Sequence, residues 1–363
     1  MGIFLFSQDC FAAKKLTMPR IGQNPLKWIE IDQKPSRITV MTIVYIPELD
    51  GYWKESLDVL KLCLQSLWQN TNQSFDLMVF DNGSCDAVRD FLQEEKLAGR
   101  IQFLIFSTYN LRKLGALNFM FSCAPGEIVS YFDSDVYLRP DWLDATLLVM
   151  DAFPEAGQVS ALPTADKANL FCSSTYEAIN NNLSLVVIQG ENLIPEKFIH
   201  AHYSSIGKTR EIYFENITER KDMKITRSNV SAFVSAQDFQ FTTRRDVIQK
   251  ILPLDVLSPE EYYDPIYSPV FESRINNLGY WRLSTEDYLI HHIGNKLPSK
   301  EDEDLWVYGA DDSNLHSSHT QARFTQSKYR KFTKWLYQNQ YFRRLLKKIN
   351  SLTYSMLYKN SHA

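Results

Sequence analysis

The chain has 363 residues, of which 44% are hydrophobic, 23% charged and 13% aromatic, and its formal net charge is −4. This composition is typical of globular proteins and excludes a wholly disordered chain, a collagen-like repeat and a small disulfide-stabilised scaffold. At about 100–200 residues per domain, the length predicts two domains or one large α/β unit with an appended part.

The first predicted elements follow an N-terminal stretch, residues 1–37, that shows no sustained hydrophobic periodicity. Residues 38–46 (ITVMTIVYI) are apolar and β-branched, which is typical of a strand covered on both faces. Leucines at helical spacing then predict an amphipathic helix over 54–70. The alternation continues with predicted strands over 75–80, 101–106 and 127–132, and with predicted helices over 86–98 and 113–123.

This strand–helix rhythm predicts βαβ units and an α/β fold whose mostly parallel central sheet is flanked by helices. Ligands of such sheets bind outside the carboxyl ends of the strands. The residues that directly follow the four predicted strands are Pro47 and Glu48, Asp81 and Asn82, 109–113, and 133–135. We therefore expect these polar loops to meet at one edge of the sheet.

Beyond about residue 165 the pattern is less regular, and residues 172–230 contain few clear elements. Strand-like segments cover 231–236 and 238–248. A further helix is predicted to begin at Asp264, because an acidic cap followed by proline suits a helix start, and to end at Gly279.

Two carboxylates, Asp133 and Asp135, follow the strand over 127–132 and are separated by one residue. Such a pair places hard oxygen ligands close together and suits Mg²⁺ or Mn²⁺, with substrate phosphates completing the coordination shell. The D-x-D pattern arises easily by chance, and residues 302–304 also match it. Only the first match follows an apolar strand in the βα array, and this position favours a metal site there.

Several segments in order carry a family resemblance: 79–86 (VFDNGSCD), 110–118 (NLRKLGALN), 124–143 (APGEIVSYFDSDVYLRPDWL) and 292–295 (HIGN). Together they resemble the motif series of family 2 glycosyltransferases of the GT-A fold. The resemblance is good over about 38–165, partial over 231–295 and absent at both ends. It implies a nucleotide-sugar-dependent, inverting glycosyltransferase.

The resemblance also implies donor-site roles for residues at the strand ends. Asp81 would contact the nucleobase, Glu48 would lie beside the base or ribose, and Asp133 would approach the ribose. Without the family resemblance, the alternative for residues 81–83 is a plain turn, and the alternative for Arg112 and Lys113 is surface charge at the start of a helix. The implied donor-binding residues are Pro47, Glu48, Asp81, Asn110, Arg112, Lys113, Asn118 and Asp133.

The metal ligands implied by the resemblance are Asp135, Asp133 and His292, for Mn²⁺ or Mg²⁺. Mn²⁺ tolerates an imidazole ligand more readily than Mg²⁺ does. The alternative for His292 is a structural histidine that ties the last segment to the sheet. A cation held by Asp135, with Arg112 or Lys113 nearby, would stabilise the negative charge of the departing nucleoside diphosphate.

The general base is where the sequence departs from the family. Family members commonly carry a Glu-Asp pair at the start of the helix that ends in Arg…Gly-Tyr, but counting back from 279–280 reaches Tyr267 and Ser268. The catalytic candidates are therefore Asp264, whose role as a helix cap would also explain it, and Asp238. Glu260 and Glu261 are further options.

The C-terminal tail differs in charge from the rest of the chain. Residues 313–363 contain ten Lys or Arg and no Asp or Glu, so the rest has 29 basic against 43 acidic residues. Aromatic and aliphatic residues alternate with these cations, which indicates an amphipathic helix or helix pair. We expect residues 321–363 to contact an anionic membrane surface; docking on the catalytic body and a solvated face are the alternatives. No nucleic-acid partner is expected, because no binding module is present.

Five scattered cysteines favour a reducing compartment, and the N-terminus does not resemble a signal peptide. The longest apolar run, 38–46, is about half of what a bilayer-spanning helix needs. The expected location is cytoplasmic, with peripheral attachment to the inner face of the membrane through the tail.

These inferences divide the chain into an N-terminal extension (1–37), a donor-binding half (38–165), an α+β acceptor-binding half (166–312) and a basic helical tail (313–363). The expected activity is metal-dependent, inverting transfer of a single sugar, of hexosyltransferase type, from a nucleotide-diphosphate-sugar to a saccharide or lipid-linked acceptor. Cell-surface polysaccharide or glycolipid biosynthesis would be its setting. The alternative is a catalytically silent partner subunit that binds nucleotide-sugar or glycan, because the Glu-Asp pair is missing.

Overall fold

The computed structural model describes residues 24, 34–164, 172–180, 184–205, 222–257 and 270–298. The chain divides into two compact units, Met1–Pro35 and Ser36–Ala363, and the fold described below is that of the second unit. The predicted start of a helix at Asp264 and the basic tail lie outside the described residues. Within the described ranges, no helix has both the length and the apolar character that crossing a membrane requires.

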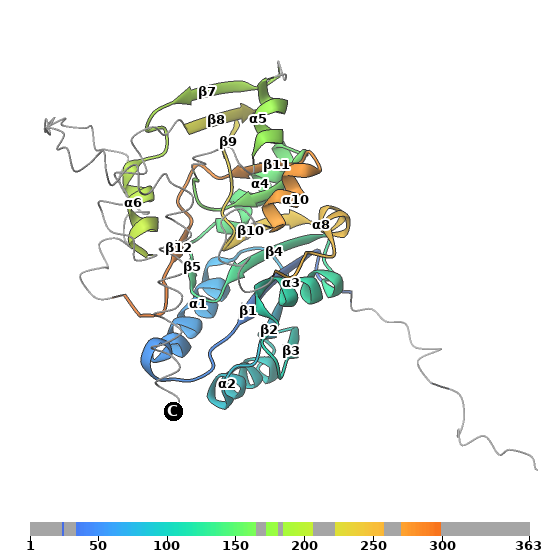
Figure 1. Cartoon of the computed structure of the whole chain (residues 1–363), viewed down its shortest axis with the longest axis vertical. Coiled ribbons are helices and arrows are strands. Elements are labelled where there is room, and N and C mark those ends of the chain that lie inside the picture. The colour runs from blue at the N-terminus through green and yellow to red at the C-terminus, as the bar shows by residue number, and fades with distance from the viewer. Residues whose placement is uncertain are drawn as a thin grey trace, which may run out of the picture. The chain divides into compact units, whose positions relative to one another are not determined.

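The core of the fold is a ten-stranded sheet with the strand order β3-β2-β1-β4-β10-β6-β11-β9-β8-β7 (Figure 1). Seven of these strands run in one direction, and only β7, β9 and β10 run against them. The prediction of a mostly parallel sheet is therefore confirmed. A small second sheet pairs β12 with β5. The strands are β1 (Ile38–Val44), β2 (Phe75–Asp81), β3 (Phe103–Phe106), β4 (Ile128–Asp133), β5 (Val136–Leu138), β6 (Ala156–Ser160), β7 (Val186–Gly190), β8 (Asp222–Arg227), β9 (Val230–Val234), β10 (Gln240–Arg244), β11 (Trp281–Ser284) and β12 (Ile290–His292).

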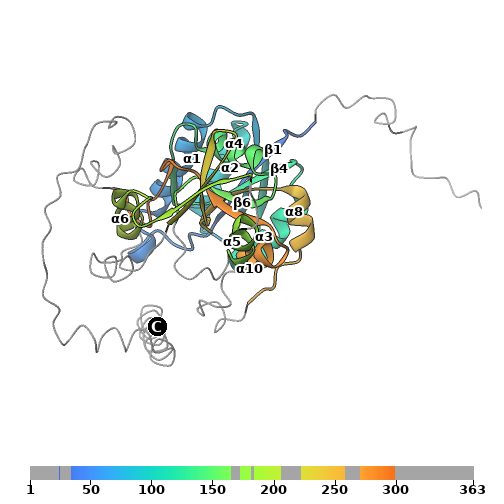
Figure 2. The ribbon, with the colours of Figure 1, turned by 90° about the horizontal axis from the view of Figure 1, so that it is seen from above.

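Helices cover both faces of the sheet (Figure 2). Val40 and Val44 of β1 pack into the core on the side of α1, α2 and α4, whereas Met41 packs into the core on the side of α3, α8 and α10. This two-sided burial explains why the strand is mostly apolar on both faces, with Thr39 and Thr42 as its only polar residues. The helices are η2 (a 3₁₀ turn, Gly51–Trp53), α1 (Ser56–Asn70), α2 (Asp86–Leu97), α3 (Arg112–Cys123), α4 (Trp142–Ala152), α5 (Ser173–Asn180), α6 (Glu196–Ser205), α8 (Arg245–Ile251) and α10 (Val270–Asn277).

The four predicted strands of the donor half are present as β1 to β4, and their carboxyl ends meet at one edge of the sheet. Parallel pairing sets Val44 of β1 opposite Asp81 of β2. On the other side of β1, Ile43 lies opposite Asp133 of β4. The loops that follow these strands therefore lie side by side, as the sequence predicts.

The segment predicted as one strand over 238–248 forms two elements, and this part of the prediction is wrong. Strand β10 ends at Arg244, and helix α8 begins at the next residue. Val247, Ile248 and Ile251 are buried at helical spacing, so the hydrophobic period changes inside the segment.

β10 lies between β4 and β6 and is antiparallel to both. The sheet is thus continuous across the predicted boundary between the two halves near residue 165, and that boundary stays a prediction.

Gly279 follows the C-terminus of α10, as predicted. Its φ angle of +79° lies in the left-handed region, which glycine adopts at little cost. The backbone N–H of Gly279 donates to the carbonyl of Asn276 at 3.0 Å, and that of Tyr280 donates to the carbonyl of Ile275 at 3.2 Å. These bonds use carbonyl groups that the last turn leaves without helical partners.

Candidate functional site

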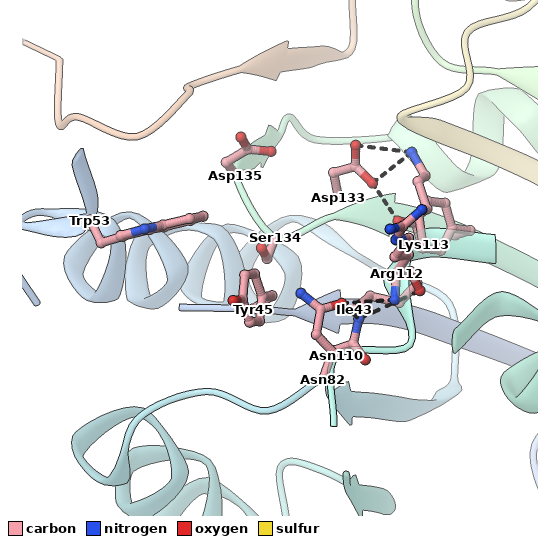
Figure 3. A pocket seen from close by; sticks show the side chains of 11 residues that line it. Ile43, Tyr45, Trp53, Asn82, Asn110, Arg112, Lys113, Asp133, Ser134 and Asp135 are labelled. Carbon is pink, nitrogen blue, oxygen red and sulfur yellow. Dashed lines mark hydrogen bonds and ion pairs between the residues drawn. The ribbon is translucent and has the colours of Figure 1, made fainter. Parts of the chain in front are cut away.

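A cavity of about 490 Å³ opens at the edge of the sheet where β1, β2 and β4 end (Figure 3). Its lining mixes apolar and aromatic side chains with a few convergent charged and amide groups, which is typical of small-molecule sites. It also has the position expected for ligands of parallel sheets. The lining residues are Ile43, Tyr45, Trp53, Asn82, Asn110, Arg112, Lys113, Tyr131, Asp133, Ser134 and Asp135.

Two aromatic rings form one wall of the cavity. Tyr45 lies just after β1, and Trp53 ends the 3₁₀ turn η2; their ring centroids are 5.8 Å apart at an interplanar angle of 82°. Gly51, with a φ angle of +52°, allows this turn to form, and the Asp50 side chain accepts a bond of 2.7 Å from its N–H. Flat rings of this kind can stack on a nucleobase.

The sequence did not single out Tyr45 and Trp53. It selected Pro47 and Glu48, which lie in the same connection but do not line the cavity. A signal for the aromatic pair was present in the Asp-Gly turn at 50–51, which brings the chain back toward the strand end. The roles predicted for Pro47 and Glu48 stay predictions.

The turn after β2 is built around Asp81, whose side chain is fully buried. One carboxylate oxygen accepts from the N–H of Ser84 at 3.0 Å, and the other lies 3.5 Å from Nε of Arg89. Gly83, with a φ angle of +94°, allows the turn. Asp81 does not line the cavity, whereas the next residue, Asn82, does. The predicted contact of Asp81 with a base stays a prediction.

Asn82 organises the neighbouring loop that leads into α3. Its Oδ1 accepts from the N–H of Leu111 at 2.7 Å, and its Nδ2 donates to Oδ1 of Asn110 at 3.0 Å. Oδ1 of Asn110 also accepts from the N–H of Arg112 at 2.7 Å. Through these bonds Arg112 is held at a φ angle of +59°. For a residue with a side chain this conformation costs about 1–2 kcal/mol.

Lys113 and Asp133 form an ion pair inside the cavity (Figure 3). Nζ of Lys113 lies 3.0 Å and 3.1 Å from the two carboxylate oxygens and also donates to the backbone oxygen of Asp238 at 3.3 Å. Burial by itself would lower the pKa of Lys113, but the negative charge of Asp133, with Asp238 adding to it, raises that pKa well above its usual value. The side chains are 26% and 28% exposed, so a ligand can reach the pair.

Tyr131 is the second partner of Asp133. Its hydroxyl donates to Oδ1 of Asp133, and its ring lies under the Lys113 ammonium, which is 5.2 Å from the ring centroid. Burial and the adjacent Asp133 charge raise the pKa of Tyr131 well above its usual value, so the hydroxyl stays protonated and remains a donor. The Asp133 carboxylate thus already has a cation and a hydroxyl as partners.

Asp135 lies apart from Lys113 in Figure 3. Its carboxylate meets His292. Nε2 of His292 lies 3.4 Å from Oδ2 of Asp135. Two backbone features bring them together: the pairing of β12 with β5 sets His292 opposite Val136, and the N–H of Ile293 donates to the backbone oxygen of Asp135 at 2.7 Å. The ring of Phe239 contacts His292 edge-on at a centroid distance of 5.4 Å. Two of the three predicted metal ligands therefore come together.

No cluster of three or more His, Cys, Asp or Glu side chains that could hold a metal ion occurs in the part of the chain that the structure describes. Asp135 and His292 nevertheless suit Mn²⁺, which accepts oxygen and imidazole nitrogen ligands and can take its remaining ligands from phosphate and water. These two residues fit the ion, and Asp133, already paired with Lys113, fits it less well.

The remaining predicted site residues lie outside the cavity lining. Asn118 of α3 ties down the segment after α8: its Nδ2 donates to the backbone oxygen of Leu254 at 2.8 Å, and its Oδ1 accepts from the N–H of Leu254 at 2.7 Å. Asp238 is exposed in the loop between β9 and β10, where its backbone oxygen contacts Lys113. Asp264 lies outside the described residues.

Sequence comparisons relate part of the chain to a known family. A family model described as Glycosyl transferase family 2 matches residues 52–214. Over these residues the chain is thus similar to family 2 glycosyltransferases. A protein of Haemophilus influenzae described as an uncharacterized glycosyltransferase is 27% identical over 89 residues, which are 24% of this chain and 27% of that protein. The ten-stranded sheet confirms the predicted α/β class with a mostly parallel central sheet flanked by helices, and the family match supports a glycosyltransferase.

Solved structures of glycosyltransferases show distant likeness. A mannosyltransferase from Pyrobaculum calidifontis in complex with GDP-Man and Mn²⁺ is 15% identical, with a TM-score of 0.36 over 61% of this chain and 48% of that one. S. aureus TarS 1–349 is 16% identical, with a TM-score of 0.38 over 70% and 59%. GalNAc-T7 with UDP, GalNAc and Mn²⁺ is 10% identical, with a TM-score of 0.42 over 71% and 43%. The chain thus spans about half the length of the mannosyltransferase and about a quarter of the H. influenzae protein.

Proposed function

We propose that this chain is a metal-dependent, inverting glycosyltransferase that moves one sugar from a nucleotide-diphosphate-sugar to a hydroxyl of a saccharide or lipid-linked acceptor. The observation that carries the proposal is the cavity at the carboxyl ends of β1, β2 and β4, in which aromatic rings, two cations and two carboxylates converge. A nucleotide-sugar has matching parts: a flat base, a ribose with hydroxyl groups and a charged diphosphate.

The lining supports a specific orientation of the donor. The base would stack on Tyr45 and Trp53, at the end of the cavity formed by η2. The ribose hydroxyl groups would donate to Asp133, whose carboxylate is already fixed by Lys113 and Tyr131. A carboxylate held in this way needs little reordering when the donor binds, which favours affinity.

Asp135 and His292 are the residues that would hold the divalent ion, Mn²⁺ or Mg²⁺. When bound, the ion would stabilise negative charge on the diphosphate as the glycosidic bond breaks. Phe239 packs against His292 and fixes the plane of its imidazole ring, so the ring nitrogen stays directed at the carboxylate. Ser134, between the two acids, adds a hydroxyl group to the same wall.

The transfer also needs a group that accepts the proton of the acceptor hydroxyl. As the hydroxyl oxygen bonds to the anomeric carbon, the bond from that carbon to the diphosphate breaks, its electron pair leaves with the diphosphate, and the proton passes to a carboxylate. Asp264 and Asp238 are the candidates for this base. Of the two, Asp238 is described: it is exposed beside the cavity, where its backbone oxygen contacts Lys113.

For the acceptor and the location in the cell, the proposal rests on the sequence. The basic residues of 321–363 would hold the enzyme at the anionic inner face of the membrane, where lipid-linked saccharides are presented. Cell-surface polysaccharide or glycolipid biosynthesis is the corresponding process. Co-sedimentation with anionic and neutral liposomes, before and after deletion of 321–363, tests this part; unchanged binding after the deletion would end it.

The experiment that tests the activity compares wild type with Asp135→Asn in a panel of nucleotide-sugars with Mn²⁺ and mixed saccharide acceptors, measuring released nucleoside diphosphate. Asp90→Asn is the matched control, because Asp90 is an exposed aspartate of α2 outside the cavity. We expect Asp135→Asn to lower the rate about a hundredfold or more and Asp90→Asn to leave it unchanged. Equal rates in wild type and Asp135→Asn would refute the metal role. Nucleotide binding without turnover under any condition would favour the silent partner subunit instead.

A further inference from the structure

The backbone at Arg112 adopts a conformation that an arginine disfavours. Its φ angle is +59°, and the preceding residue, Leu111, has φ −81° and ψ 2°. Two side chains hold this shape: Oδ1 of Asn82 accepts from the N–H of Leu111 and Oδ1 of Asn110 accepts from the N–H of Arg112, both at 2.7 Å. A glycine would adopt the same shape without strain. Strained residues held by their surroundings cluster at functional sites, so a role for the Arg112 side chain is worth testing.

Arg112 and the adjacent Lys113 differ in whether a carboxylate neutralises their charge. Lys113 already has Asp133 as a partner at 3.0 Å. Arg112 forms no ion pair with any carboxylate in the described part of the chain; its Nη1 donates to the neutral backbone oxygen of Leu257 at 3.3 Å. The exposed guanidinium of Arg112, with its five N–H groups, therefore lines the cavity, and no carboxylate among the described residues neutralises its charge.

We propose that Arg112, and not Lys113, is the cation that binds the diphosphate of the donor, an assignment that rests on the proposed nucleotide-sugar site. The planar guanidinium can bind a phosphate through two parallel hydrogen bonds. Arg112 is also the first residue of α3, a helix of 12 residues, so the positive end of the helix dipole adds to its charge. Lys113 instead fixes Asp133.

Three variants test this assignment. Arg112→Gln removes the charge and keeps the backbone strain, whereas Arg112→Gly removes both. Ser228→Gly is the matched control for strain: Ser228 has a φ angle of +51° in the turn between β8 and β9 and does not line the cavity. Binding of UDP, GDP, uridine and guanosine to each full-length variant is measured by calorimetry with Mn²⁺, and the melting temperature is recorded without ligand.

We expect both Arg112 variants to bind the preferred nucleoside diphosphate about ten- to hundredfold more weakly, with the matching nucleoside changed less than about twofold. Arg112→Gly and Ser228→Gly should each melt about 1–3 °C higher than wild type, and Ser228→Gly should bind as wild type does. If Arg112→Gln binds the diphosphate with an affinity within about twofold of wild type, the assignment of Arg112 is overturned while the proposed donor site stands. Equal losses for nucleoside and diphosphate, or a lower melting temperature for Arg112→Gly, would also overturn it. Failure of wild type to bind either diphosphate would overturn the proposed donor site as well.

Discussion

The Lys113–Asp133 pair offers a quantitative test of the electrostatics at the cavity. At the observed separation of 3.0 Å, the attraction at an effective dielectric constant of about 20 is roughly 5 kcal/mol. Desolvation and the loss of side-chain freedom offset most of this, because both side chains are only about one quarter exposed. We therefore expect a net coupling free energy of about 1–2 kcal/mol.

A double-mutant cycle measures that coupling. Lys113→Met, Asp133→Asn and the double variant are unfolded in guanidinium chloride, and their free energies of unfolding are compared with that of wild type. Lys113→Met should cost more, about 2 kcal/mol against about 1 kcal/mol for Asp133→Asn, because it leaves Asp133 unneutralised beside Asp135 and Asp238. A coupling free energy below about 0.3 kcal/mol, or a larger cost for Asp133→Asn, would refute this account.

Three further predictions concern other parts of the molecule. Gly126→Ala should lower the free energy of unfolding by about 2 kcal/mol or more, because the added Cβ would lie 2.6 Å from the backbone nitrogen of Thr39; a loss below about 0.5 kcal/mol in chemical denaturation would contradict this. Trp53→Ala should weaken nucleotide binding about tenfold in calorimetry, and unchanged affinity would remove the stacking role. Burial opposes ionisation of Glu155, but hydrogen bonds from Arg227 outweigh it and lower the pKa of the carboxyl. The resulting stability is present above the unfolded pKa, about 4.3, and is lost as pH falls through the lower folded pKa, so acid titrations should show a smaller loss in Arg227→Met than in wild type.

Much of the donor half could be predicted because its signals are local. β1 is apolar on both faces, and α1 shows its leucines at helical spacing, so both were found within two residues of their ends. The register of parallel strands then brings their carboxyl ends together without any further information. For this reason Asn110, Arg112, Lys113, Asp133 and Asp135 were expected near one another, and all five line the cavity.

What the sequence could not supply depends on contacts between distant segments. β10 and α8 were merged, because only pairing with β4 and β6 decides where the strand ends. Trp53 reaches the cavity through a backbone turn and not through a periodic pattern. Asp81 matches the family motif, but only the fold shows that it is buried in a turn, where one oxygen accepts from the N–H of Ser84 and the other lies near Arg89 without a hydrogen bond; its contact with a base stays a prediction.

The insertion of β10 between β4 and β6 has a practical consequence for anyone who wishes to express the donor half alone. A fragment that stops near residue 165 would lack the strand that joins these two, and each would present an open row of unpaired amide and carbonyl groups. Such a fragment should aggregate rather than act as a minimal nucleotide-binding module. Loop exchanges between relatives would accordingly have to leave β10 in place between β4 and β6.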